Sequence, residues 1–171
     1  MAYIAFTTFA IMKAPYGNPA VKGFEDLTPA AFLQAEQSPG FIARAVEIDD
    51  RSELTNFERD WGEWGEFKVP RFYDGGYKTD SDTRASTLSL WESIAAVRSF
   101  VYSGFHKQAL AGRTEWFRKP EWPTYAMWWS EPGRIPTWSE AVARLELLHE
   151  GGPSPAAFTF GRTFGPLGEE L

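Results

Sequence analysis

Runs of apolar residues predict four β-strands along the chain. The first run, Tyr3 to Ile11, has apolar side chains at both odd and even positions, which is typical of a strand covered on both faces. The other runs are Phe41 to Ile48, Ala85 to Trp91 and Tyr125 to Trp129. The third strand has one apolar face and one more polar face, a pattern that suits the wall of a cavity. The pattern therefore indicates a sheet that is covered on both faces.

Helix signals stand between these strands. Thr28-Pro29 places an N-cap residue before a proline and predicts a short helix that ends at Gln37. Ser89-Leu90-Trp91-Glu92 has the form of a capping box and predicts a helix directly after the third strand, which Gly104 interrupts. A second helical piece is expected over Phe105 to Phe117.

The last predicted helix follows the fourth strand. Thr137-Trp138-Ser139-Glu140 is another capping box and opens this helix, which Gly151-Gly152-Pro153 ends. Beyond it, Ala157 to Phe160 is predicted to add an edge strand. Residues 161–171 are expected to be a flexible tail, so the domain spans residues 1–160.

The predicted elements follow the order βαββαβ, with an extra helix near the C-terminus. This order is the ferredoxin-like arrangement of an α+β protein. Its four-stranded sheet has helices on one face only, so the other apolar face needs a cover. We expect a second copy to supply that cover, sheet against sheet, in a homodimeric α/β-barrel that encloses a cavity.

Residues 49–84 form a long region without regular periodicity. Loops of this length are usually functional lids or disordered inserts. Five large rings in two short motifs, Trp61 to Glu66 and Arg71 to Tyr77, disfavour disorder. We therefore expect a lid or a dimer contact, and we assign Trp64 and Tyr73 to substrate binding. Aromatic residues make up 16% of the chain, an excess that indicates an apolar cavity.

The composition excludes several classes of function. The chain has 171 residues, enough for one domain, and no cysteine, which excludes disulfides, thiolate metal sites and cysteine nucleophiles. The net charge is −6 and the 17 Lys and Arg are scattered, which opposes nucleic acid as a partner. The first apolar stretch lacks a basic region and is interrupted by Lys13, so we expect a cytoplasmic protein without a membrane span. Phosphate-loop and serine-hydrolase motifs are absent.

The chain has two histidines, which lie in different predicted helices. His149 falls in the last turn of the helix begun at Thr137, where it interacts favourably with the helix dipole, so its expected role is structural. His106 follows Gly104 and is the candidate catalytic residue, as a general base, a hydrogen-bond donor or an axial haem ligand. The alternative is a structural histidine that bonds a nearby backbone carbonyl. A metal site would need both histidines to converge, and none is predicted.

Several residues near His106 are candidates for substrate binding. Ser89 and Trp91 lie on the more polar face of the third strand, and Tyr102 follows in the next helix. Trp128 and Trp129 point to opposite faces of the fourth strand, so one of them faces the cavity. We assign Trp128 to that wall.

A resemblance to a known family rests on several motifs in the same order along residues 3 to 160. The motifs are the stretch from Ala14-Pro15 through Ser38-Pro39-Gly40-Phe41, then Leu88 to Ser93, Phe100-Val101-Tyr102 with His106, Glu115-Trp116-Phe117, Trp128-Trp129, Pro136-Thr137 and Ala141 to Leu148. Through these motifs the chain resembles the DUF3291 family, which is similar to the dimeric α/β-barrel superfamily of antibiotic-biosynthesis monooxygenases, polyketide cyclases, muconolactone isomerases, haem-degrading enzymes and chlorite dismutases. The resemblance implies a cavity-facing histidine after the third strand, which His106 matches, and a tryptophan at the end of that strand, which Trp91 matches.

The function we expect is that of an enzyme of small-molecule or secondary metabolism. Cofactor-independent oxygenation, cyclisation or isomerisation of an aromatic or polyketide-like molecule would begin with removal of a proton next to a carbonyl. His106 is the base, and Arg44, Ser89 or Tyr102 donates to the oxyanion. Arg44 has an alternative role as a solvated or ion-paired strand residue. Two other functions stay open: haem binding through His106, and non-catalytic binding of an apolar molecule.

Overall fold

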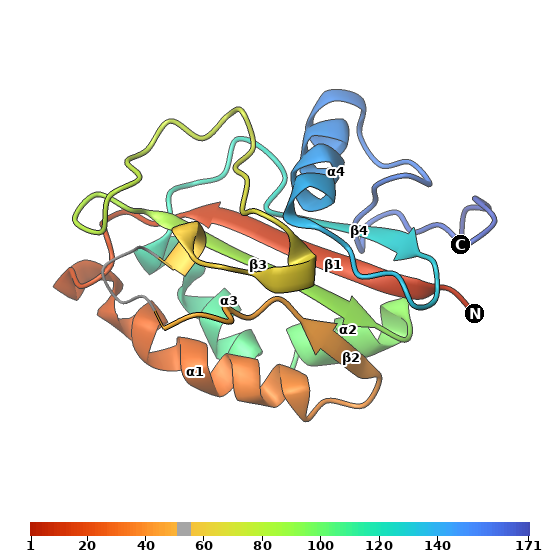
Figure 1. The fold of residues 1–171 in the computed structure, drawn as a ribbon, viewed down its shortest axis with the longest axis horizontal. Helices are drawn as coiled ribbons and strands as arrows, with labels where there is room; N and C mark the ends of the chain where they lie inside the picture. Colours follow the sequence, from red (N-terminus) through yellow and green to blue (C-terminus); the bar gives the residue numbers. More distant parts are fainter. Residues whose placement is uncertain (51–55) are drawn as a thin grey trace.

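The computed structural model describes residues 1–50 and 56–171 and contains one antiparallel sheet with helices on both sides (Figure 1). The sheet has the strand order β2-β3-β1-β4. This order and the chain order of the elements are those of the ferredoxin-like arrangement. The principal elements are β1 (Tyr3–Ile11), α1 (Lys22–Glu36), β2 (Phe41–Arg44), β3 (Arg84–Trp91), α2 (Ile94–Val101), α3 (Gly104–Trp116), β4 (Tyr125–Ser130) and α4 (Trp138–Gly151).

Side chains of β1 alternate between two separate cores, one on each face of the sheet. Ile4 and Phe6 point to the side of α1, α2 and α3, where they join a core with Trp91. Ala5 and Phe9 point to the opposite side, toward α4 and the segment before β3. In Figure 1 the first three helices lie below the sheet, and α4 and much of the yellow segment lie above it. We call these two sides the helical face and the insert face.

The insert face is covered by the chain itself. Five rings of the predicted long region, each no more than 9% exposed, pack on the sheet together with one face of α4. They are Phe57, Trp61, Trp64, Phe67 and Tyr73. The rings supply the cover that we expected from the sheet of a second copy, so this region is a core element and not an open lid. The homodimer and its sheet-to-sheet barrel stay predictions, because the structure describes a single chain.

Two predicted helix starts are wrong, and both have a local cause. The N-cap before a proline is Asn18-Pro19, which opens a short 3-10 turn leading into α1. Thr28 lies inside α1, where its hydroxyl donates to the Phe24 carbonyl at 2.9 Å. Helix α2 is capped by Ser93, whose hydroxyl accepts the Ala96 N–H at 3.1 Å. The predicted capping box at Thr137 is confirmed, since both of its hydrogen bonds form with Glu140.

The C-terminal segment is packed and not a free tail. Phe158, inside the predicted edge strand, pairs with Met127 of β4 through two backbone hydrogen bonds of 2.9 Å, which form an isolated bridge. Farther on, the Trp129 indole donates to the Phe164 carbonyl at 2.7 Å, and Phe164 is only 6% exposed. The segment is held because its apolar rings complete the core of the helical face. Among the described residues, no helix is long and apolar enough to cross a membrane.

Candidate functional site

His106 lies in the first turn of α3, at the joint between α2 and α3. Its Nδ1 is 2.9 Å from the carbonyl oxygen of Val101, in the last turn of α2. A carbonyl oxygen only accepts, so Nδ1 carries the proton and Nε2 of the neutral ring is the acceptor. The ring packs against Phe100 with its centre 4.7 Å away. The contact with a backbone carbonyl is the one expected of a structural histidine, and it leaves Nε2 as a base.

The environment of His106 keeps its ring neutral. Burial lowers the pKa of the His106 imidazole, and the hydrogen bond to the Val101 carbonyl opposes this effect without cancelling it. A histidine with a lowered pKa is unprotonated at neutral pH. The base form of Nε2 is therefore the resting form.

Trp91 and Ser89 lie behind the His106 ring, inside the core. Trp91 is 0% exposed and stacks on Phe100 at 5.1 Å. Its indole N–H donates to the Ser89 hydroxyl at 2.8 Å, and that hydroxyl lies 3.3 Å from the Phe6 carbonyl, to which it donates. Both side chains have satisfied partners within the core, so they support Phe100 and are not placed to contact a ligand beside His106.

Exposed rings flank His106 on the surface. Tyr102 is 53% exposed and Phe105 is 45% exposed, and both stand at the joint between α2 and α3. The Tyr102 ring packs against Phe160 of the C-terminal segment at 5.8 Å. The joint thus presents an apolar surface that also carries the Tyr102 and Ser103 hydroxyls.

A hollow of about 370 Å³ runs along α2 and ends beside this joint. Phe100 and Ser103 line its end; His106 does not line the hollow, but its ring packs against Phe100. Glu92 and Ser93 line the other end, opposite Gly40 of the turn before β2. A hollow of this size accommodates a small molecule.

The structure does not bring the other predicted binding residues to this place. Arg44 pairs with Glu36 at 2.7 Å and lies over the ring of Phe32. Of the two roles considered for Arg44, it therefore has that of an ion-paired strand residue. Trp128 is 2% exposed on the insert face, in the same core as Trp64 and Tyr73. Trp129, and not Trp128, points to the helical face. The cause is the register of β4, because Trp128 pairs with Ala5 of β1 and Trp129 with Ile4.

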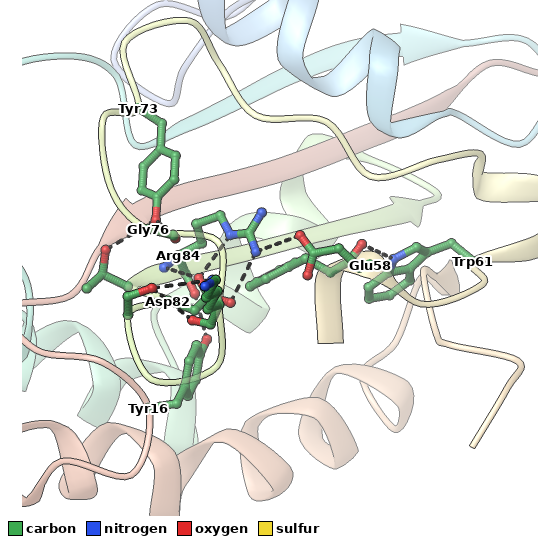
Figure 2. A network of polar contacts seen from close by, with 11 residues as sticks. Tyr16, Glu58, Trp61, Tyr73, Gly76, Asp82 and Arg84 are labelled. Carbon is green, nitrogen blue, oxygen red and sulfur yellow. Dashed lines mark hydrogen bonds and ion pairs between the residues drawn. The ribbon is translucent and has the colours of Figure 1, made fainter. Parts of the chain in front are cut away.

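The structure contains a buried ionic cluster that the sequence reasoning did not identify. Arg84, the first residue of β3, is 1% exposed and donates to Asp82 at 2.9 Å and to Glu58 at 2.9 Å. Figure 2 shows its guanidinium between these two carboxylates. The guanidinium carbon also lies 4.8 Å from the ring centre of Phe57 and 4.9 Å from that of Tyr77. Burial works against the charge of Arg84, but the two carboxylates outweigh it and raise its pKa.

Two tyrosines join this cluster through backbone carbonyls. The Tyr16 hydroxyl donates to the Arg84 carbonyl at 2.7 Å, and the Tyr73 hydroxyl donates to the Gly76 carbonyl at 2.7 Å (Figure 2). Burial raises the pKa of both hydroxyls, with a further contribution from the charge of Asp82. They therefore stay protonated and act as donors. The cluster ties the long segment to β3, and the signal that could have found it is the Asp82-x-Arg84 spacing at the start of a strand.

No group of three or more histidine, aspartate or glutamate side chains in the described ranges is arranged to hold a metal ion. The His106 ring contacts the ring of Phe100 and the carbonyl of Val101, and its Nε2 has no other assigned role in the described site. The site is suited to proton transfer and hydrogen bonding.

Solved structures offer distant likenesses. A protein of unknown function from Nitrosomonas europaea, NE2512, is 11% identical and aligns over 80% of this chain and 97% of its own, with a TM-score of 0.46. SnoaB, a cofactor-independent oxygenase from Streptomyces nogalater, is 9% identical over 80% of this chain and 99% of its own, with a TM-score of 0.43. The ferredoxin-like assignment therefore rests on the strand order given above.

Among curated proteins, none matches this chain. The family model described as "Domain of unknown function (DUF3291)" matches residues 3–170. The match extends from the first strand through the packed C-terminal segment. The chain therefore belongs to the DUF3291 family, as its motifs predict.

Proposed function

We propose that this protein is an enzyme that removes a proton from the carbon next to the carbonyl of a small molecule, with His106 Nε2 as the base. The observation that carries the proposal is the hydrogen bond from Nδ1 to the Val101 carbonyl, which directs the unprotonated nitrogen away from the backbone. The lowered pKa of His106 supports it, because the base is available at neutral pH.

The proposed step balances within the site. The C–H proton moves to Nε2, and the electron pair of that bond moves toward the carbonyl oxygen and forms an enolate. The resulting imidazolium keeps its Nδ1 hydrogen bond to the Val101 carbonyl, which stabilises the positive charge. The exposed hydroxyl of Tyr102 is the proposed donor to the enolate oxygen. Of the three donors expected from the sequence, Arg44 is paired with Glu36 and Ser89 is buried with both of its partners.

The proposed substrate lies against the exposed rings at the joint and extends into the hollow along α2. Phe105 and Tyr102 offer it apolar surface, and Ser103 and Glu92 offer it hydrogen-bonding groups. An aromatic carbonyl compound fits these features. Isomerisation, cyclisation and oxygenation each begin with the proposed proton removal, and the later fate of the enolate distinguishes them.

Exchange of hydrogen for deuterium tests this proposal directly. An aryl-fused ketone, 2-tetralone, is incubated with the protein in D₂O, and loss of its signals next to the carbonyl is followed by proton NMR. We expect catalysed exchange that slows by about 100-fold in His106→Ala, the lower end of the usual contribution of a general base. His149→Gln is the matched control, because it removes the other histidine, and should leave exchange unchanged. Absence of catalysed exchange, or exchange that survives in His106→Ala, would contradict the proposal.

Haem binding through His106 is the alternative with a specific observation behind it. Histidines that bind metals commonly donate their other ring N–H to a backbone carbonyl, as His106 does. The surrounding residues fit a planar macrocycle poorly, because Phe100 already packs on the ring and Trp91 is fully buried behind Phe100. A shifted haemin absorption band that disappears in His106→Ala would favour this alternative over proton removal.

A further inference from the structure

Gln34 of α1 reaches the joint between α2 and α3 with its side chain. Its amide nitrogen donates to the Ser103 carbonyl at 3.0 Å and to the Phe100 carbonyl at 3.4 Å. Its amide oxygen accepts the backbone N–H of His106 at 3.1 Å. One side chain from a third helix therefore holds the end of α2 and the start of α3 together.

The joint needs such a partner because helix ends leave backbone groups unpaired. Helix α2 ends at Val101 and α3 begins at Gly104, so carbonyls and N–H groups meet within a few residues. The N-cap residue of α3, Ser103, makes no side-chain hydrogen bond to the helix. Gln34 takes over this capping role, since its oxygen accepts from the third residue of α3, where an N-cap side chain normally bonds.

Gly104 makes room for this approach. It has a φ of +51°, a region that favours glycine, and an added Cβ would lie 2.8 Å from the Gln34 amide oxygen. A side chain at this position would push Gln34 away from the joint. Gly104, which interrupts the predicted helix, thus also allows Gln34 to bond the ends of both helices.

His106 is held on both sides of this joint. Its ring bonds a carbonyl of α2, while its backbone N–H bonds Gln34 of α1. The ring hydrogen bond survives only while the last turn of α2 and the first turn of α3 keep their separation. Gln34 fixes that separation, because it bonds Phe100 of α2 on one side and, on the other, Ser103 and His106 at the start of α3.

We propose that Gln34 is a positioning residue that keeps the Nδ1 proton of His106 on the Val101 carbonyl and so keeps Nε2 as the base. Its catalytic consequence rests on the proposed function, whereas its effect on the His106 ring does not. A residue of α1 thereby controls the protonation and orientation of a residue of α3. Small displacements of a catalytic group lower rates strongly, so this control is expected to affect turnover.

NMR of the histidine ring nitrogens tests the proposal. The chain has only two histidines, so His149→Gln assigns the His106 signals without ambiguity. In the wild type we expect the tautomer protonated at Nδ1 and a pKa below the ordinary value. Gln34→Met keeps the length of the side chain but removes both hydrogen-bonding atoms. It should shift His106 toward a mixture of tautomers and lower its pKa further, because the hydrogen bond to the Val101 carbonyl is the contact that raises the pKa against burial.

Two further variants separate positioning from stability. Ser38→Ala removes the hydrogen bond of 2.7 Å from the Ser38 hydroxyl to the Gln34 backbone carbonyl, and is the matched control that should lower the melting temperature without moving the His106 signals. Gln34→Glu keeps an acceptor for the His106 N–H but loses the donor to the Phe100 and Ser103 carbonyls, so it should also disturb the Nδ1 tautomer, while its negative charge raises the pKa of His106. Unchanged His106 tautomer and pKa in Gln34→Met would overturn the proposal and leave Gln34 a packing residue.

Exchange rates separate this inference from the proposed function. With 2-tetralone, Gln34→Met should lower the maximal exchange rate by about tenfold and leave KM nearly unchanged. If Gln34→Met alters the NMR signals of His106 but the wild type catalyses no exchange, the proposed function is refuted and the positioning role of Gln34 is supported. If the His106 signals are unchanged in Gln34→Met while exchange is lost in His106→Ala, the positioning role of Gln34 is refuted and the proposed function is supported.

Discussion

The two faces of the sheet are covered by different elements and differ in what they leave near the surface. The insert face buries five rings of one long segment, one side of α4 and an ionic cluster at Arg84. The helical face has a break between α2 and α3, a glycine with positive φ and a partly buried histidine at its rim. The insert face is covered by rings of its own chain, while the helical face keeps the partly buried imidazole of His106 at its rim. Aromatic abundance alone therefore does not locate a binding site, because the richest cluster of rings is structural.

The largest expected effect belongs to the insert face. Trp138, 1% exposed, packs edge-on against Trp61 at 5.1 Å and against Phe67 at 4.8 Å. Trp138→Ala should lower the free energy of unfolding by about 3–5 kcal/mol in urea titration. Its indole nitrogen has no hydrogen-bond partner in the described part of the chain, so Trp138→Phe should cost less. A Trp138→Ala loss as small as that of the exposed Phe105→Ala would show that the long segment is a loose lid after all.

The ionic cluster comes next. Arg84→Met leaves Asp82 buried without its cation, so the free energy of unfolding should fall by about 3 kcal/mol. Adding Asp82→Asn removes the unpaired charge and should restore part of that loss. If the double variant is as unstable as the sum of the two single variants, the pair is not coupled, and the cluster does not hold the segment on β3.

A smaller effect is expected at the start of α4. Thr137→Ala removes the hydroxyl that accepts the backbone N–H of Glu140. It should lower the free energy of unfolding by about 1 kcal/mol in urea titration. The deuterium exchange rate should not change, because α4 lies on the insert face. A loss of exchange activity in this variant would break the separation between the two faces.

The smallest effect concerns the pH dependence of stability. The folded state lowers the pKa of His106, so the unfolded chain binds the proton more readily. The contribution of His106 to the free energy of unfolding is therefore fully present above the unfolded-state pKa of about 6.5. It is lost as the pH falls through the lower pKa of the folded state. His106→Gln should flatten this part of the stability curve in urea titrations on both sides of that pH. An equally steep decline in the variant would assign the pH dependence to another group.

The sequence predicted the fold better than the roles of individual rings. The order of elements, the sheet and the Thr137 capping box are confirmed. Trp64 and Tyr73 were recognised as residues that need a partner, but that partner is the sheet of the same chain. The start of α1 was missed because the chain has two N-cap-proline signals close together, Asn18-Pro19 and Thr28-Pro29. The earlier one begins the helical region.

By itself, the sequence predicted the apolar faces of the regular elements and the kind of element that most segments form, because periodicity and caps act over a few residues. Only the tertiary structure decided what each buried position packs against. Gln34 and the backbone of His106 are 72 residues apart in the chain, and no local pattern links them. His106 was visible as a candidate, but its tautomer depends on one carbonyl at a helix joint that a third helix holds in place. Such a contact is fixed by the packing of whole elements, which the order of residues encodes only collectively.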